Sequence, residues 1–147
     1  MASKVNNYFK QRVAEGEIDL DADTLKILLV TDQTTADTEG NIQTLSGYAT
    51  LGEFDGANYE VKTLANLTHA LDTGNERFEL DADNVTYTAL GASGTQNNVQ
   101  GVLLYKHVDG TDANDQPIAF IEFSSTLTPD GSDVTISWDA EGILQLT

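Results

Sequence analysis

Short segments that are apolar, or that alternate between apolar and polar residues, recur along this chain with turn residues between them. Leu25–Thr31 is an apolar run, which is typical of a strand covered on both faces. Residues 99–108 and 118–123 are also apolar enough for central strands, and Val85 and Tyr87 alternate with threonines as in a half-buried strand. The pattern predicts about seven or eight short strands.

Turn signals separate these segments. Residues 128–131 read Thr-Pro-Asp-Gly, with proline at the second and glycine at the fourth position of a tight reversal. Further turns are expected at residues 72–75 and 139–142, and polar loops at residues 91–98 and 109–117. With a single helix expected, the sequence predicts an all-β chain. Its expected fold is an antiparallel β-sandwich, jelly-roll-like or immunoglobulin-like.

Residues 3–15 predict a short amphipathic helix that Ser3 caps and Gly16 ends. A helix of about 12 residues is marginal alone, so it must dock on something. We therefore expect an N-terminal helical arm over residues 1–16 and a β-sandwich domain over residues 17–147. Four apolar residues share the expected face of the helix: Val5, Tyr8, Phe9 and Val13.

The charge of the chain is strongly negative and unevenly distributed. Seven Lys and Arg against 24 Asp and Glu give a formal net charge of −17, which repels phosphate backbones and anionic lipid. Nucleic acid and membranes are therefore poor candidate partners. Residues 1–14 carry Lys4, Lys10 and Arg12 and no acid, a charge of +3, while the remaining chain carries −20. We expect the N-terminal segment to meet a different neighbour from the rest of the surface.

No membrane span is expected, because no apolar run approaches the roughly 20 residues that crossing a bilayer requires. The N-terminus lacks the apolar core of a signal peptide, so we expect the product to stay where it is made. The chain contains no cysteine, which excludes disulfides, thiolate metal sites and a cysteine nucleophile.

The string Leu-Asp-Ala-Asp occurs twice, at residues 20–23 and 80–83. Alternating carboxylates open a calcium-binding EF-hand loop, but that loop needs Gly at its sixth position and Glu at its twelfth. Counted from Asp19, those positions hold Thr24 and Val30, and the second copy fails similarly. We interpret both strings as lead-ins to strands, where carboxylates accept backbone N–H bonds. No metal or cofactor is expected, although surface calcium stays an open alternative.

Catalysis has little support in the sequence. His69 and His107 are the two histidines, and neither lies in a recognisable nucleophile motif or a cluster of metal ligands. The many carboxylates make chance pairs inevitable, so pairing carries no information about glycoside hydrolysis. The chain is expected not to be an enzyme.

The aromatic residues divide into expected core and expected surface. Trp138 shares a strand face with Val134 and Ile136, which favours a core position. Most tyrosines also occupy strand positions, whereas Tyr8 and Phe9 belong to the helix, which need not bury both. The candidate contacts with a partner protein or a sister subunit are Lys4, Tyr8, Phe9, Lys10 and Arg12. In the alternative interpretation, which the sequence supports equally well, the helix covers an open edge or end of its own sandwich.

Several short segments of the sequence, taken in their order along the chain, resemble those of a known family. The chain resembles the small β-sandwich head-decoration, or cement, proteins of tailed bacteriophages. The strings that carry it are residues 9–10, 16–31, 53–59, 81–87, 101–106, 117–123 and 136–143. The resemblance implies a non-enzymatic virion component, made in the host cytoplasm, that binds the major capsid protein on the outer capsid surface. It also implies a homo-oligomer, a trimer or a dimer, and supplies no catalytic or metal residues.

Two other readings remain open. One is a phage tail or fibre-associated module that recognises a host surface glycan, which should display aromatic residues in loops 91–98 or 109–115, where there are none. The other is a calcium-dependent adhesion domain, which a chelator should destabilise.

Overall fold

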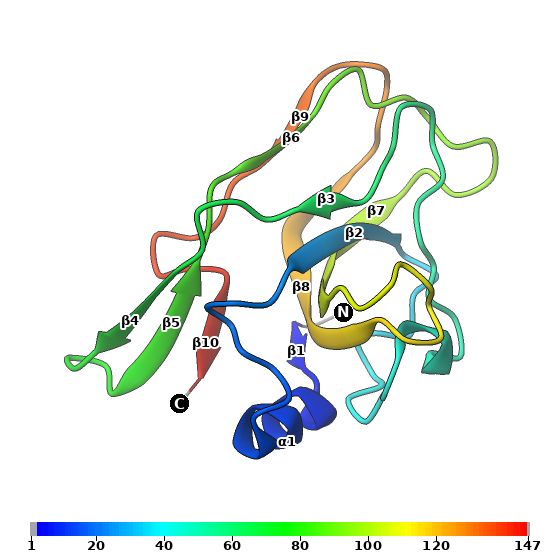
Figure 1. The fold of residues 1–147 in the computed structure, drawn as a ribbon. Coiled ribbons are helices and arrows are strands. Elements are labelled where there is room, and N and C mark those ends of the chain that lie inside the picture. Colours follow the sequence, from blue (N-terminus) through cyan, green and yellow to red (C-terminus); the bar gives the residue numbers. More distant parts are fainter. Residues whose placement is uncertain (1–2, 147) are drawn as a thin grey trace.

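The apolar runs of the sequence form a five-stranded antiparallel sheet in the computed structural model, which describes residues 3–146 (Figure 1). Its strand order is β1-β8-β7-β2-β3. The bounds of these strands are β1 Lys4–Val5, β2 Leu25–Thr31, β3 Lys62–Thr63, β7 Val99–Lys106 and β8 Gln116–Leu127. The apolar segments expected at residues 25–31, 99–108 and 118–123 are thus the three central strands, which confirms the all-β antiparallel prediction.

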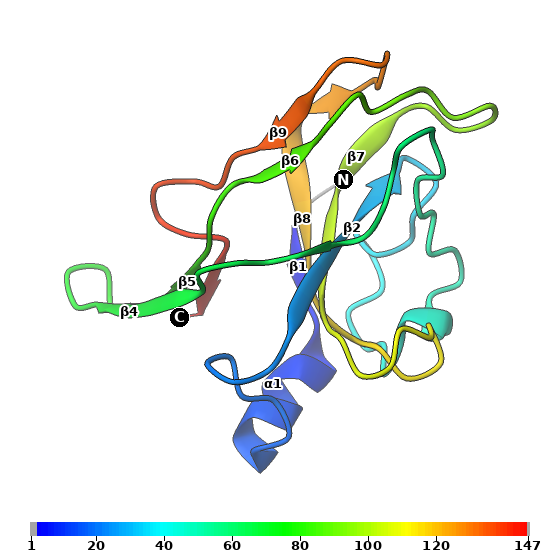
Figure 2. The same ribbon diagram turned by 45° about the horizontal axis from the view of Figure 1, so that its top comes forward.

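Two smaller antiparallel sheets complete the strands of the described residues. One has the order β10-β5-β4, and the other pairs β6 with β9. Figures 1 and 2 show the β4–β5 hairpin projecting from one side of the molecule, and β6 with β9 above the large sheet. The bounds are β4 Thr68–Asp72, β5 Arg77–Asp81, β6 Val85–Tyr87, β9 Val134–Ile136 and β10 Leu144–Leu146.

Both faces of the sheet are buried along β2, β7 and the first half of β8, which explains why these segments are largely apolar. In β2, Ile27 and Leu29 face a core shared with the smaller sheets and the helix. Leu28 and Val30 face a second core beneath loop 32–61. The short helix η1, Leu45–Gly47, lies in that loop and buries Leu45.

The N-terminal helix begins later than the sequence predicts. Helix α1 spans Asn7–Glu15, and the Asn6 side chain caps it by accepting the Tyr8 N–H at 2.8 Å. Lys4–Val5 is a strand paired with β8, so the prediction that Ser3 caps the helix is wrong. The hydroxyl of Ser3 instead accepts the N–H of Glu122 at 2.9 Å. Gly16 ends the helix in the left-handed conformation, as predicted.

Beside β2, the stretch of residues 59–63 forms a strand at only two residues, Lys62–Thr63. Side chains and loop backbone take over the edge of β2 beyond it. The Tyr59 hydroxyl accepts the N–H of Leu29 at 3.2 Å and donates to Glu53 at 2.8 Å. The Leu29 carbonyl accepts the N–H of Phe54 at 2.9 Å. This edge therefore has hydrogen-bond partners without a full strand beside it.

A wide bulge interrupts the pairing of β7 with β8. Gly101 pairs with Glu122, and Val99 pairs with Leu127. The two pairs are therefore separated by two residues along β7 but by five along β8. Residues 123–126 belong to no strand pairing among the described residues. The bulge bends β8 and carries its end up beside β9 (Figure 2).

Candidate interaction surfaces

The N-terminal segment is built into the molecule. β1 extends the large sheet, and the Asn6 N–H donates to the Ile118 carbonyl at 2.8 Å. Phe9 is 0% exposed and belongs to the main core. The expected contact of Phe9 with a partner is therefore wrong, because the ring packs inside its own chain. The position of Phe9 agrees with the alternative interpretation, in which the helix covers its own sandwich.

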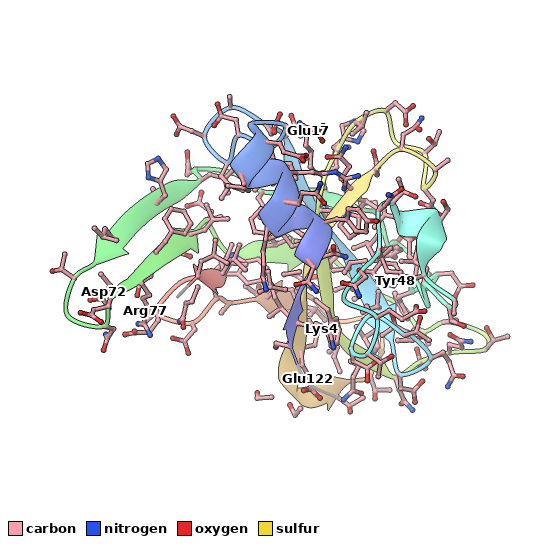
Figure 3. All side chains as sticks on the ribbon, turned by 90° about the horizontal axis from the view of Figure 1, so that it is seen from below. Lys4, Glu17, Tyr48, Asp72, Arg77 and Glu122 are labelled. Carbon is pink, nitrogen blue, oxygen red and sulfur yellow. The ribbon has the colours of Figure 1, made fainter. Side chains whose placement is uncertain are left out.

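The other predicted contacts are exposed to different extents. Arg12 is held within the chain, since it donates to the Gln43 carbonyl at 2.8 Å and its side chain is 13% exposed. Its guanidinium also lies over the half-buried ring of Tyr8, 5.7 Å from the centroid. Lys4 is half-buried on β1 (Figure 3), whereas Lys10 is exposed and donates to the Asn7 side chain at 3.2 Å. Lys10 is thus the most accessible of the five.

An apolar surface that the sequence did not predict lies between the helix and the β4–β5 hairpin. Val13 is 39% exposed and Leu71 is 72% exposed. Leu71 pairs with Phe78 across the hairpin, so both side chains share one face of it. A hollow of about 350 Å³ separates that face from the end of the helix. We call these residues the helix–hairpin surface: Val13, Leu20, His69, Leu71 and Phe78.

His69 lies within this surface. Its ring stacks on Phe78 with 6.2 Å between the ring centroids, and its Nε2 is 3.6 Å from a carboxylate oxygen of Asp21. Position 71 could have been recognised from the alternation of β4, but residues 68–72 contain too few apolar residues to stand out as a strand.

The first Leu-Asp-Ala-Asp string forms a self-bonded turn before β2. Asp23 accepts the N–H of Asp19 at 2.8 Å, and Asp19 accepts that of Asp21 at 3.0 Å. Lys106 pairs with Asp23 at 2.8 Å. In the second string, Asp83 accepts the side-chain amide of Asn66 at 2.6 Å. The prediction that these carboxylates accept backbone N–H bonds ahead of a strand is confirmed for the first string. In the second string, Leu80 and Asp81 end β5 rather than precede a strand, and Asp81 accepts the N–H of Ala82 at 2.8 Å.

A second acidic group surrounds Arg77 beside the turn of the β4–β5 hairpin. Carboxylate oxygens of Asp72, Glu79 and Glu141 lie within 4.8 Å of one another. Arg77 makes ion pairs with all three, at 3.5 Å to Asp72 and 2.8 Å to Glu79 (Figure 3). The guanidinium thus already occupies the position in which a cation would balance these charges. The arrangement is an ion-pair network that ties β5 to the turn before β10.

His107 and Asp115 close the loop that follows β7. One carboxylate oxygen of the buried Asp115 accepts three backbone N–H groups, from Val108, Asp109 and Gly110. The other oxygen lies 3.6 Å from Nδ1 of His107. In residues 3–146, no hydrogen bond joins either histidine to a serine or threonine hydroxyl. The pair therefore holds the loop, and its geometry contains no activated nucleophile.

Several loop carboxylates have lowered pKa values. The Asn75 side chain donates to Asp72 and lowers its pKa. Hydrogen bonds from Thr111 and Ser132 lower the pKa of Asp109 and Asp130 in the same way. Each of these groups stabilises a tight turn while it is ionised.

A groove of about 580 Å³ runs between the end of β8 and β9. Ile121, Phe123 and Leu127 line one wall, and Val134 and Trp138 line the other. Trp138 packs against the core but is half-buried, and its indole N–H donates to the Asp83 carbonyl at 2.9 Å. The expectation of a core Trp138 is therefore correct only for one side of the ring. Alternation could not reveal the other side, because the bulge in β8 opens the groove.

Comparisons of the chain with protein-family models, with curated proteins and with solved structures find no match. Within the described residues, α1 has nine residues, and no helix has the length and apolarity needed to cross a bilayer.

Proposed function

We propose that this chain is a virion structural protein of a tailed bacteriophage that binds the outer surface of the capsid and stabilises it. It acts without catalysis, as a head-decoration or cement protein. The observation that carries the proposal is the helix–hairpin surface, where Val13 and Leu71 are exposed beside the basic N-terminal segment of an otherwise strongly acidic chain. Exposed apolar groups gathered in this way are typical of a docking site.

The physical basis of such a role is burial of area across a seam between capsid subunits. An interface of ordinary size buries about 800 Å² on each partner. This chain exposes 7279 Å², so docking of that size uses about a ninth of its surface. A particle that holds DNA under pressure gains from such bracing. The remaining acidic surface then faces solvent, where it keeps neighbouring copies soluble.

The proposal assigns separate roles to the N-terminal residues. Lys10 contacts an acidic region of the capsid protein or of a sister subunit, while Val13 and Leu71 supply the buried apolar contact. Phe9 and Arg12 act indirectly, because Phe9 anchors the helix in the core and Arg12 holds it against residue 43. The chain is a homo-oligomer, a dimer or a trimer, on the particle.

The test measures binding of purified chain to heads that lack it. The double variant Val13→Gln, Leu71→Gln should bind at least about tenfold more weakly, because it removes the apolar contact while keeping helix and strand. Lys10→Glu should weaken binding in a salt-dependent manner. Val108→Gln is the matched control, since Val108 is 48% exposed but lies in the loop after β7. Equal binding by the double variant and the control, with equal melting temperatures, would refute this docking surface.

A further inference from the structure

The end of β8 offers strand backbone that the molecule does not use. On one side, β7 leaves residues 123–126 unpaired across the bulge. On the other side, within residues 3–146, β1 pairs with Ala119 and Phe120, and the Ser3 hydroxyl accepts the N–H of Glu122. β9 likewise pairs only with β6, and it forms the opposite wall of the groove. Exposed edges of this kind are templates for an added strand.

The groove has the dimensions that an extended segment needs. The unpaired part of β8, residues 123–126, corresponds to about 13 Å of strand, enough for about four residues of a partner. A smaller hollow of about 290 Å³, beside β1 and β10, shares Ile121, Gly142 and Ile143 with the groove and continues it along β8. The whole depression therefore follows β8 from its paired middle part to its unpaired end.

The lining of the groove defines which side chains fit. Its walls are mainly aliphatic and aromatic, with hydroxyls such as Ser125, Thr135 and Ser137 between them. Aliphatic walls offer few partners for the hydroxyl groups of a sugar, so they favour apolar side chains. In an added strand every second side chain points into the groove, while the backbone hydrogen bonds supply affinity.

The charge around the groove defines the rest of the ligand. No Lys or Arg occurs in residues 107–147. Asp139 lines the groove, and Asp130, Asp133 and Glu141 lie on the neighbouring turns. This potential attracts a basic segment, whereas a second copy of a chain with net charge −17 would add repulsion.

We propose that this groove binds an extended segment of another protein, with alternating apolar residues flanked by Lys or Arg, as an added β-strand along the end of β8. The partner completes the sheet at the position where β8 turns away from β7. This site lies apart from the helix–hairpin surface, and it does not depend on whether the chain belongs to a virion.

The test uses a synthetic peptide, Lys-Val-Thr-Val-Lys-Ile-Thr-Val-Lys, as the probe. Trp138 is the single tryptophan of the chain and lines the groove, so its fluorescence reports binding directly. We expect a saturable change in emission and slower amide exchange at residues 123–126. A peptide with Glu in place of each Lys should bind at least about tenfold more weakly. A peptide N-methylated at every residue, which cannot donate to the ladder from either edge, should lose binding similarly.

Two matched variants locate the site. Ser137→Arg places a long cation in the groove at an exposed position and should weaken binding of the basic peptide at least about tenfold. Thr88→Arg makes the same change at an exposed position outside the lining and should leave binding within about twofold. Both substitutions are at exposed hydroxyls, so folding should be retained, which the melting temperature checks.

Several results would overturn the proposal. They are the absence of saturable binding, equal binding of the N-methylated peptide, and equal loss in the two variants. Self-association that Ser137→Arg abolishes would assign the groove to a second copy instead. A response of Trp138 to oligosaccharides but not to the peptide would assign it to a glycan.

Discussion

Gly101 occupies the point at which β7 approaches the start of the bulge in β8. A Cβ atom at this position would lie 2.3 Å from the Ile121 carbonyl oxygen, which is backbone and has no room to move. Gly101→Ala should therefore lower the free energy of unfolding by about 1–3 kcal/mol, the usual cost of overpacking. Urea unfolding measures this. Gly94→Ala is the control, because nothing lies within 4 Å of its Cβ, and an equal effect of the two changes would contradict the bulge geometry.

Tyr59 makes two hydrogen bonds that replace a missing strand at the edge of β2. Tyr59→Phe removes the acceptor of the Leu29 N–H, and Leu29 is fully buried. An unsatisfied buried N–H costs about 1–3 kcal/mol, so this variant should unfold at a correspondingly lower urea concentration. Tyr8→Phe, whose hydroxyl has no hydrogen bond within the described residues, should stay close to the wild type. A neutral Tyr59→Phe would show that water satisfies Leu29.

Among the elements, the start of α1 is where the structure differs most clearly from the prediction made from the sequence. Asn6→Ala removes the cap and should lower the free energy of unfolding by about 0.5–2 kcal/mol. Ser3→Ala should cost less, because the exposed Ser3 hydroxyl accepts one N–H at the end of β1. Thermal unfolding followed by far-ultraviolet circular dichroism compares them. A larger loss from Ser3→Ala would place the cap where the sequence predicted it.

The three central strands could be predicted because their apolar character is local. Leu25–Thr31 is apolar on both faces, and no partner needs to be known to recognise this. β1 could not be predicted in this way, because Lys4 and Val5 become a strand only by pairing with Phe120 and Ala119, more than a hundred residues away. Their spacing from Tyr8 and Phe9 fits a helix equally well.

The candidate surfaces follow the same division between local and distant information. The exposure of Lys10 followed from its place on an amphipathic helix. The burial of Phe9 depends on core residues from other elements, which the helical pattern does not contain. The groove depends on the register between β7 and β8, and its only local trace is the polar run of residues 124–126 within an otherwise apolar strand.

For the whole molecule, charge should govern how stability depends on pH and salt. The net charge of −17 destabilises the folded state by self-repulsion, so acidification from neutral pH to about pH 5 should raise the free energy of unfolding. Asp72, Asp109 and Asp130 have pKa values lowered below the ordinary 3.8. Their stabilisation is fully present above that value and is lost as the pH falls through their own pKa values. Stability should therefore decline again below about pH 3.8.

Urea unfolding across this pH range, with and without added sodium chloride, measures both effects. Salt should stabilise the chain at neutral pH by screening the repulsion, and should have less effect in mild acid. A steady fall in stability from neutral pH downwards, with no response to salt at neutral pH, would show that repulsion is unimportant in this fold.

The central claim is that the chain is bound in place on a capsid by the helix–hairpin surface. Electron microscopy of the intact particle that carries it tests this most directly. We predict density for residues 3–146 on the outer surface of the head, with α1 and the β4–β5 hairpin against the capsid and the acidic surface towards solvent. Density at the tail, no density on the head, or a helix–hairpin surface that faces solvent would contradict it.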